Sequence, residues 1–276
     1  MCNLVDPINI YDVRFFALRR SGHHAIINWL AYHFHVRPIF IEGVVPFKDP
    51  YVDIDSQLRC VLMGDQYRKY NHRTLRQLRF RTKYLIMNFE EQPIAPDYIN
   101  DEFIGKSARA YNVVVIRDPF NWMASRYQIA NSKLVLRPNS DAINLWKQYA
   151  REYLGMTNTL INKVPINYNQ WFKSEIYRRG ISDIFKLQFT DKGLEQVPDA
   201  GRGSSFDQRL FDGKAQQMDV LGRWRKFVGD PKFASIFKDD ELIWLTKQCF
   251  GETMVELQNI LDAVLSAHPS TVRCGL

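Results

Sequence analysis

Two short segments of the sequence carry residue types that suit the binding of phosphate or sulfate groups. The first is Leu-Arg-Arg-Ser-Gly-His-His at 18–24, and the second is Val-Val-Val-Ile-Arg-Asp-Pro at 113–119. Guanidinium groups, hydroxyls and the backbone N–H groups at a helix N-terminus are donors that proteins offer to such anions. The sequence therefore predicts an anion site built from two segments that lie about one hundred residues apart.

The first segment lies between a buried-strand pattern and a helical pattern. A glycine at such a turn lets the backbone approach a ligand, and the unpaired N–H groups and dipole of the following helix favour negative charge. Arg19 and Arg20 add positive charge there. The segment is not a Walker A loop, because no Lys-Ser/Thr pair follows Gly22 to hold phosphate and magnesium.

This segment resembles the 5′-phosphosulfate loop of sulfotransferases that use 3′-phosphoadenosine-5′-phosphosulfate (PAPS), whose usual form is Lys/Arg-Ser-Gly-Thr-Thr. The resemblance implies that Arg20 contacts the bridging oxygen, and it leaves open whether a histidine that replaces a threonine contacts the ligand or acts in catalysis. A plain tight turn with solvent-facing arginines is the alternative. The nucleotide-binding residues that the resemblance implies here are Arg19, Arg20, Ser21, Gly22, His23, His24 and Ala25.

The second segment is similar to the 3′-phosphate segment of the same family, in which an Arg ends a central strand and a Ser follows eight positions later. Arg117 and Ser125 reproduce both residue types and the spacing. Ligands bind at the carboxyl ends of strands in open α/β sheets, and a guanidinium fork suits phosphate. The alternative is an Arg–Asp turn contact beside a helix-surface Ser.

Two later segments resemble the family more loosely. Tyr168 ends a short apolar run as the family's Tyr-Glu-Asp tyrosine does near adenine, although Asn169 replaces the acidic residue. The alternative is that Tyr168 is an ordinary core residue.

The polar stretch 201–206, together with 221–225, resembles the loop that closes over the 3′-phosphate. The alternative is that this stretch is a plain polar loop. The residues implied in this loop are Arg202, Gly203, Ser204 and Ser205.

The catalytic base has no single candidate in the sequence. Where many family members carry a His, the stretch 87–92 has none, and Glu90 and Glu91 are the carboxylates at the expected strand end. A partly buried carboxylate can have the raised pKa that suits a general base. Exposed loop acids are the alternative, and His24 and His23 are rivals for the role. With Arg20, the catalytic candidates are Glu90, Glu91 and His24.

The elements that must position these residues alternate between strands and helices. Apolar runs predict strands at 11–18, 59–63, 84–89, 112–116 and 165–168. Helical spacing predicts helices at 23–34, from about 120 to 127, at 142–161, 171–185 and 239–265, the last interrupted by Gly251, with a loop at 190–213. This order predicts an α/β fold with a central, mostly parallel sheet flanked by helices. The resemblance implies a P-loop NTPase-like sulfotransferase fold in a single domain, 1–276.

Composition narrows the class of protein. The 276 residues are 46% hydrophobic and 24% charged, which suits a folded core, and the net charge of +7 suits an anionic partner. The cysteines lack zinc spacing and indicate reduced thiols. The sequence shows neither a signal-peptide pattern nor an apolar run long enough to span a bilayer, so we expect a cytoplasmic protein without a membrane partner.

These observations favour a sulfotransferase of the soluble, bacterial type. It would move a sulfuryl group from PAPS to a hydroxyl or amine of a small, natural-product-like acceptor and release adenosine 3′,5′-bisphosphate (PAP), with no metal required. A P-loop-like nucleotide kinase or other phosphotransferase is one alternative. Another is a non-catalytic phosphate- or nucleic-acid-binding module built on the basic run 68–83. That run lacks aromatic residues patterned for base stacking, so no nucleic-acid partner is expected. The acceptor and the oligomeric state are not indicated.

Overall fold

The strands of the protein form one twisted sheet. The computed structural model describes residues 8–52, 60–62, 83–96, 98, 101–130, 140–198, 203–251 and 259. Within them the strand order is β3-β2-β4-β1-β5-β6, and the edge strand β3 runs antiparallel to β2 while the other pairs are parallel. The strands are β1 (Asn9–Ala17), β2 (Ile39–Glu42), β3 (Cys60–Leu62), β4 (Lys83–Glu90), β5 (Ala110–Ile116) and β6 (Lys163–Asn167).

The centre of the sheet is the most apolar part of the chain. Side chains on β1 and β5 point alternately to opposite faces, and both faces are covered, so these strands read as continuous apolar runs. The register pairs Ala17 with Glu90 on one side and with Val115 on the other. The carboxyl ends of the three central strands therefore meet at one edge of the sheet.

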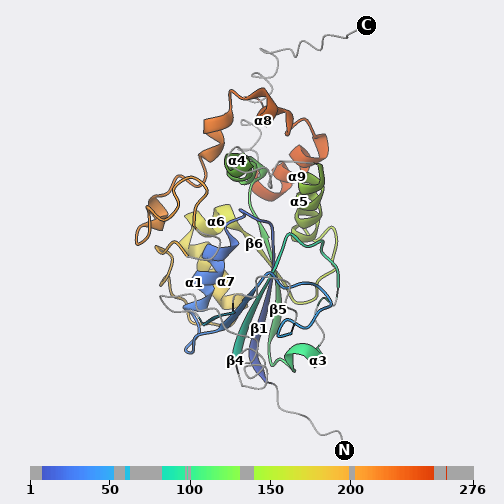
Figure 1. Ribbon diagram of the computed structural model, residues 1–276, viewed down its shortest axis with the longest axis vertical. Helices are drawn as coiled ribbons and strands as arrows, with labels where there is room; N and C mark the ends of the chain where they lie inside the picture. Colours follow the sequence, from blue (N-terminus) through green and yellow to red (C-terminus); the bar gives the residue numbers. More distant parts are fainter. Residues whose placement is uncertain are drawn as a thin grey trace, which may run out of the picture.

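Helices cover both faces of the sheet (Figure 1). On one face, α1, α6 and α7 pack on Val13, Phe15 and Val115. On the other face, α4, α5, α8 and α9 pack on Phe16, Met87 and Val114. The helices are α1 (His23–Ala31), α3 (Asp101–Ile104), α4 (Pro119–Ala130), α5 (Ser140–Tyr153), α6 (Tyr168–Lys173), α7 (Glu175–Ile184), α8 (Pro231–Ser235) and α9 (Asp240–Phe250), with short 3-10 turns η3 (Ala215–Gln217) and η4 (Arg223–Phe227).

The predicted α/β fold with a mostly parallel sheet flanked by helices is confirmed, and the differences lie at element ends. The helix predicted over 142–161 ends at Tyr153, because Gly155 has a positive φ of 73° and the N–H groups of Gly155 and Met156 bond back to the carbonyls of Glu152 and Arg151. The helix predicted over 171–185 is two helices, since the Ser174 side chain accepts the Tyr177 N–H and starts α7. The sequence analysis did not anticipate β2 and α8. In the part of the chain that the structure describes, no helix has both the length and the apolar character needed to cross a membrane.

Candidate functional site

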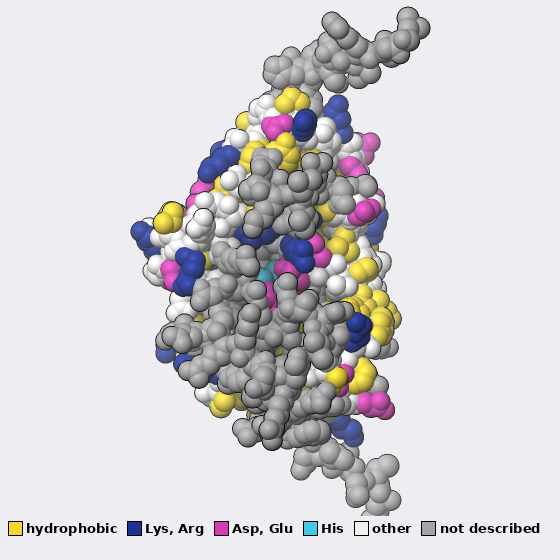
Figure 2. Space-filling view, in the orientation of Figure 1, with side chains coloured by type: hydrophobic (Ala, Val, Ile, Leu, Met, Phe, Trp, Pro, Cys, Tyr) yellow, Lys and Arg dark blue, Asp and Glu magenta, His cyan; other side chains and the backbone are white. Residues whose placement is uncertain are grey.

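The segments that leave the sheet at its carboxyl edge surround a cavity of about 450 Å³. The turn after β1, the residue after β5, the first residue of α6 and the ends of β2 and β4 all contribute side chains to it. This is the position at which open α/β sheets bind ligands. Figure 2 shows basic, acidic and histidine side chains close together near the middle of the face it presents.

The turn after β1 is built around a glycine that no other residue can replace without strain. Gly22 has φ +86°, and a Cβ at this position would overlap the ring of Tyr168. The turn begins with the Ser21 N–H bonded to the Leu18 carbonyl at 3.0 Å, and Arg20 also has a positive φ of 70°. The chain therefore enters α1 with its first N–H groups at the cavity, as the sequence predicts.

Arg117 connects the two predicted halves of the site. Its side chain is buried, and Nη1 donates to the Arg20 carbonyl at 3.0 Å and to Ser125 Oγ at 3.4 Å, while Nη2 donates to the Val220 carbonyl. Trp146 Nε1 donates to the Arg117 carbonyl at 3.0 Å. The guanidinium is thus held in one orientation beside the turn after β1.

A third arginine, Arg223 at the start of η4, reaches the same place. Its Nη1 lies 3.4 Å from Ser125 Oγ, and its Nη2 donates to Ser204 Oγ at 2.7 Å and to Asp207 Oδ2 at 3.2 Å. Because Arg20 Nη2 donates to the Gly203 carbonyl at 3.2 Å, the late loop is also tied to the turn after β1. Three cationic side chains from distant segments therefore line one cavity.

This gathering of positive charge is unfavourable in the isolated protein. Burial, with the Arg117 guanidinium nearby, lowers the pKa of Arg20 to about 10, and the same two causes lower the pKa of Arg223 to about 10. The Nε atoms of Arg117 and Arg223 are buried and have no hydrogen-bond partner. A bound anion would offset the repulsion and accept such donors, so the site fits a phosphate-type ligand.

An apolar wall continues from the arginines. The Tyr168 ring lies 5.0 Å from the Arg117 guanidinium carbon and is nearly parallel to the rings of Trp171 and Phe172, with centroids 5.8 and 6.1 Å away. All three rings line the cavity, along with Leu194, Val197 and Met218. Such a wall suits a flat aromatic group of a ligand.

The two predicted carboxylates differ in their surroundings. Glu90 lines the cavity, and its Oε2 accepts from Arg19 Nε at 3.1 Å. Glu91 is outside the cavity lining and pairs with Arg126. Of the two acids that the sequence offers as a base, only Glu90 faces the ligand space.

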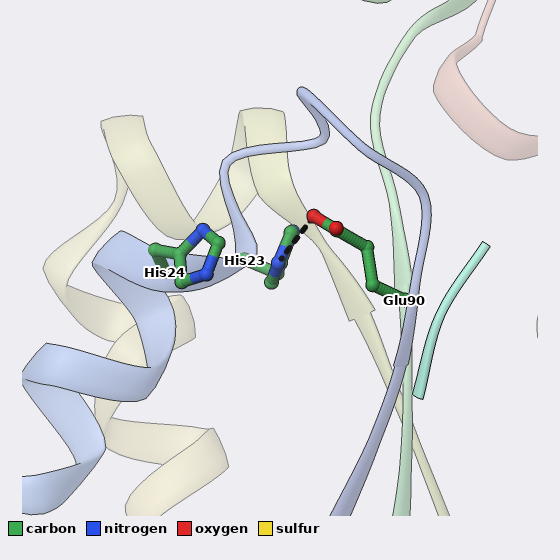
Figure 3. A group of neighbouring side chains, drawn as sticks. All are labelled: His23, His24 and Glu90. Carbon is green, nitrogen blue, oxygen red and sulfur yellow. Dashed lines mark ion pairs between the residues drawn. The ribbon is translucent and has the colours of Figure 1, made fainter. Parts of the chain in front are cut away.

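The two histidines at the start of α1 lie side by side, and His23 faces Glu90 (Figure 3). Their ring centroids are 4.0 Å apart. His23 is buried, with Nε2 3.5 Å from Glu90 Oε1, and burial, with smaller contributions from His24 and Arg20, lowers its pKa well below the ordinary value. His24 Nε2 lies 2.9 Å from Glu42 Oε1.

Some of these groups could also surround a metal ion. One ligand atom from each of His23, His24 and Glu90 lies within 4.8 Å of the others. The Arg19 pair with Glu90 and the nearby Arg20 disfavour a dication there. The donors around the cavity suit an anion better than a metal ion.

The structure brings most of the predicted residues to one place. The cavity is lined by Arg19, Arg20, Gly22, His23, His24, Ala25, Glu90, Arg117, Tyr168, Gly203 and Ser204. Ser21 and Ser125 lie behind this lining, hydrogen-bonded to His23 Nδ1 and to the Asn121 carbonyl. Ser205 is outside the lining, while Arg202 and most of the basic run lie outside the described residues.

Among the residues of the cavity lining that were not predicted as site residues, two are charged, Glu42 and Arg223. Glu42 ends β2, and the signal for it was the apolar run Ile-Phe-Ile followed by an acid. Arg223 lies in the segment 221–225, which resembles the late loop of the family. The sequence did not single out this arginine as a binding residue, yet it lines the cavity.

The comparisons with known proteins give a structural likeness but no sequence match. No family model matches the sequence, and no curated protein matches it. Among solved structures, the chain is similar to the sulfotransferase domain from the Synechococcus PCC 7002 olefin synthase, with a TM-score of 0.48 and 14% identity over 86% of this chain and 94% of that chain. A likeness at this level does not identify a family.

Proposed function

We propose that the protein is a sulfotransferase that moves a sulfuryl group from PAPS to a hydroxyl or amine of a small acceptor and releases PAP. One observation carries the proposal. The guanidinium groups of the partly buried Arg20 and of the buried Arg117 and Arg223 converge on one cavity from the turn after β1, the end of β5 and the late loop. A ligand with two separate anionic groups would match this distribution of charge.

The residues divide between the two ends of such a nucleotide. Arg117, Ser125 and Arg223, which contact one another, would hold the 3′-phosphate. Arg20 and the N–H groups at the start of α1 would hold the phosphosulfate. The apolar wall beside Tyr168 would hold the adenine. This assignment accounts for the buried Nε atoms that have no partner.

Transfer of the sulfuryl group then needs positioning and charge stabilisation. The bond between sulfur and the bridging oxygen breaks, and that oxygen leaves with the electron pair as part of PAP. Arg20 and the α1 amides would stabilise this developing charge, as oriented donors do in related transfers. The sequence after Gly22 lacks the residues that hold magnesium in nucleotide kinases.

Calorimetric titration of the full chain with PAP in the absence of metal tests the proposal. We expect saturable binding that Arg117→Ala weakens by about 10- to 100-fold, because charged hydrogen bonds are lost. Circular dichroism checks that the variant is folded. Tight binding of ATP with magnesium and none of PAP would favour a kinase and overturn the proposal, as would unchanged PAP affinity in a folded Arg117→Ala variant.

A further inference from the structure

We propose that His24, oriented by Glu42, is the general base that removes the acceptor's proton. The inference rests on the proposed sulfuryl transfer and supplies the base that the sequence leaves open.

The contact between the two residues fixes the imidazole. His24 Nε2 lies 2.9 Å from Glu42 Oε1, and both side chains are mostly buried and line the cavity. Glu42 is the last residue of β2, so the sheet itself positions this carboxylate. The rigid strand and the first turn of α1 therefore hold the pair in place.

This contact also selects the tautomer of the ring. A carboxylate accepts the N–H of the nearer nitrogen, so neutral His24 carries its proton on Nε2 and has a lone pair on Nδ1. His24 Nδ1 has no hydrogen-bond partner among the described residues, and this nitrogen is not completely buried. The lone pair is therefore accessible to a ligand.

Glu90 is less suited to take the proton. Its Oε2 is bonded to Arg19 Nε at 3.1 Å, and its Oε1 lies 3.5 Å from His23 Nε2. Both oxygens of Glu90 therefore already face other side chains, which leaves this carboxylate poorly placed to take the acceptor's proton.

His23 is also less suited, because it is enclosed. Its side chain is 2% exposed, with Nδ1 3.2 Å from Ser21 Oγ and Nε2 3.2 Å from Asn88 Nδ2. Burial lowers its pKa well below the ordinary value, which opposes protonation. His24 is the imidazole that combines access with a carboxylate to stabilise its charged form.

The two sides of the cavity carry different side chains. Arg117 and Arg223 lie beyond β1 on the β5 side, whereas Glu90 and Glu42 end β4 and β2 on the other side, where Arg19 pairs with Glu90. The donor's phosphates fit the side of Arg117 and Arg223, so the acceptor approaches from the side of His24 and Glu42.

During the transfer, one bond to sulfur forms and another bond to sulfur breaks. The acceptor oxygen or nitrogen forms a bond to sulfur while the bond between sulfur and the bridging oxygen breaks. The acceptor's proton moves to His24 Nδ1, and the electron pair of the broken bond leaves with PAP. Glu42 stabilises the resulting imidazolium, as carboxylates do in acid–base dyads.

The pH dependence follows from the groups that face the ring. These are Glu42 on β2, Glu90 on β4 and His23 on the same helix, while Arg19 and Arg20 line the same cavity. Protonated His24 cannot act as a base, so turnover is expected to fall in acidic solution. Glu42→Gln removes the carboxylate that stabilises the imidazolium, so we expect the acidic limb of the rate profile to move to lower pH.

The experiment compares His24→Asn, Glu42→Gln and Glu90→Gln with the natural chain. Transfer from ³⁵S-labelled PAPS to 2-naphthol, tyramine and water is measured, with PAP affinity measured on the same samples. We expect His24→Asn to reduce kcat by about 10²- to 10⁴-fold. Glu42→Gln reduces kcat less and shifts the acidic limb downward, with KM for PAPS unchanged.

Nuclear magnetic resonance of the imidazole nitrogens gives a readout that needs no acceptor. We expect His24 to show the Nε2–H tautomer, and Glu42→Gln to weaken the preference for that tautomer. An Nδ1–H tautomer overturns the proposal. Loss of turnover in Glu90→Gln but not in His24→Asn also overturns it. An equal loss of PAP affinity and of turnover in His24→Asn overturns it as well, because His24 would then act in nucleotide binding. Absence of PAP binding in the natural chain instead overturns the proposed function.

Discussion

Arg117 Nη1 donates a hydrogen bond to the backbone carbonyl of Arg20 at 3.0 Å, across 97 positions of sequence. The guanidinium that follows β5 therefore fixes the turn that follows β1. The same nitrogen lies 3.4 Å from Ser125 Oγ. The two predicted halves of the anion site are parts of one hydrogen-bonded unit, so damage to one half is expected to affect both.

Arg223 and Arg225 provide a matched pair of substitutions in η4. The Arg223 side chain is 8% exposed and reaches Ser125 and Ser204, whereas Arg225 is 66% exposed and lies 3.8 Å from Asp219. We expect Arg223→Ala to weaken PAP binding by about 10- to 100-fold, because contacts from a buried charge are lost. Arg225→Ala should leave the affinity unchanged. Equal effects in calorimetry would place Arg223 outside the binding site.

Gly22 and Gly213 both have a positive φ, of 86° and 84°. A Cβ at Gly22 would overlap the Tyr168 ring, whereas a Cβ at Gly213 would have no atom within 4 Å. We expect Gly213→Ala to lower stability by about 1 kcal/mol from the backbone conformation alone. Gly22→Ala should lower it further and also abolish PAP binding. Thermal unfolding and calorimetry measure both effects, and similar behaviour of the two variants would contradict the close contact with Tyr168.

Stability is expected to fall in mildly acidic solution. Burial lowers the pKa of His23 and of His33, so below about pH 6.5 the unfolded chain binds protons at these residues that the folded chain does not. The free energy of unfolding should then decrease by about 1.4 kcal/mol per pH unit for each histidine until its folded pKa is reached. Urea unfolding between pH 7.5 and 5 measures the slope.

The exposed His35 gives the control for this slope. His35→Gln should leave the slope unchanged, whereas His23→Gln should reduce it by about half over the same range. A natural chain whose stability stays flat from pH 7.5 to 5 would show that these buried histidines are not held neutral.

Glu152 is predicted to be a stability residue without a role in the site. It is buried, and its carboxylate accepts from Thr157, from the N–H groups of Thr159 and Leu160, and from Lys163. Glu152→Ala should cost about 3 kcal/mol, because it leaves these donors and a cation without a partner. Glu175→Ala, at an exposed pair with Arg179, should cost less than about 0.5 kcal/mol. Chemical unfolding compares the two, and PAP affinity should be unchanged in both.

The alternation of strands and helices was predictable from local patterns, and the ends of several helices were not. The apolar run at 112–116 identified β5, because a strand covered on both faces needs apolar residues throughout. The end of α5 depends on the left-handed Gly155 and the bonds from its N–H and that of Met156, and the break between α6 and α7 depends on the Ser174 cap. Caps are single contacts that apolar periodicity does not record.

The sequence by itself identified the two segments that meet at the cavity, because glycine, arginine and the strand-to-helix change are local properties of Arg19–His24 and Arg117–Ser125. Only the tertiary structure decided that Arg223 joins them, that Glu90 and not Glu91 faces the cavity, and that Glu42 contacts His24. These relations join residues from different strands and loops. They follow from the strand order and from burial at the carboxyl edge of the sheet, which no short stretch of sequence specifies.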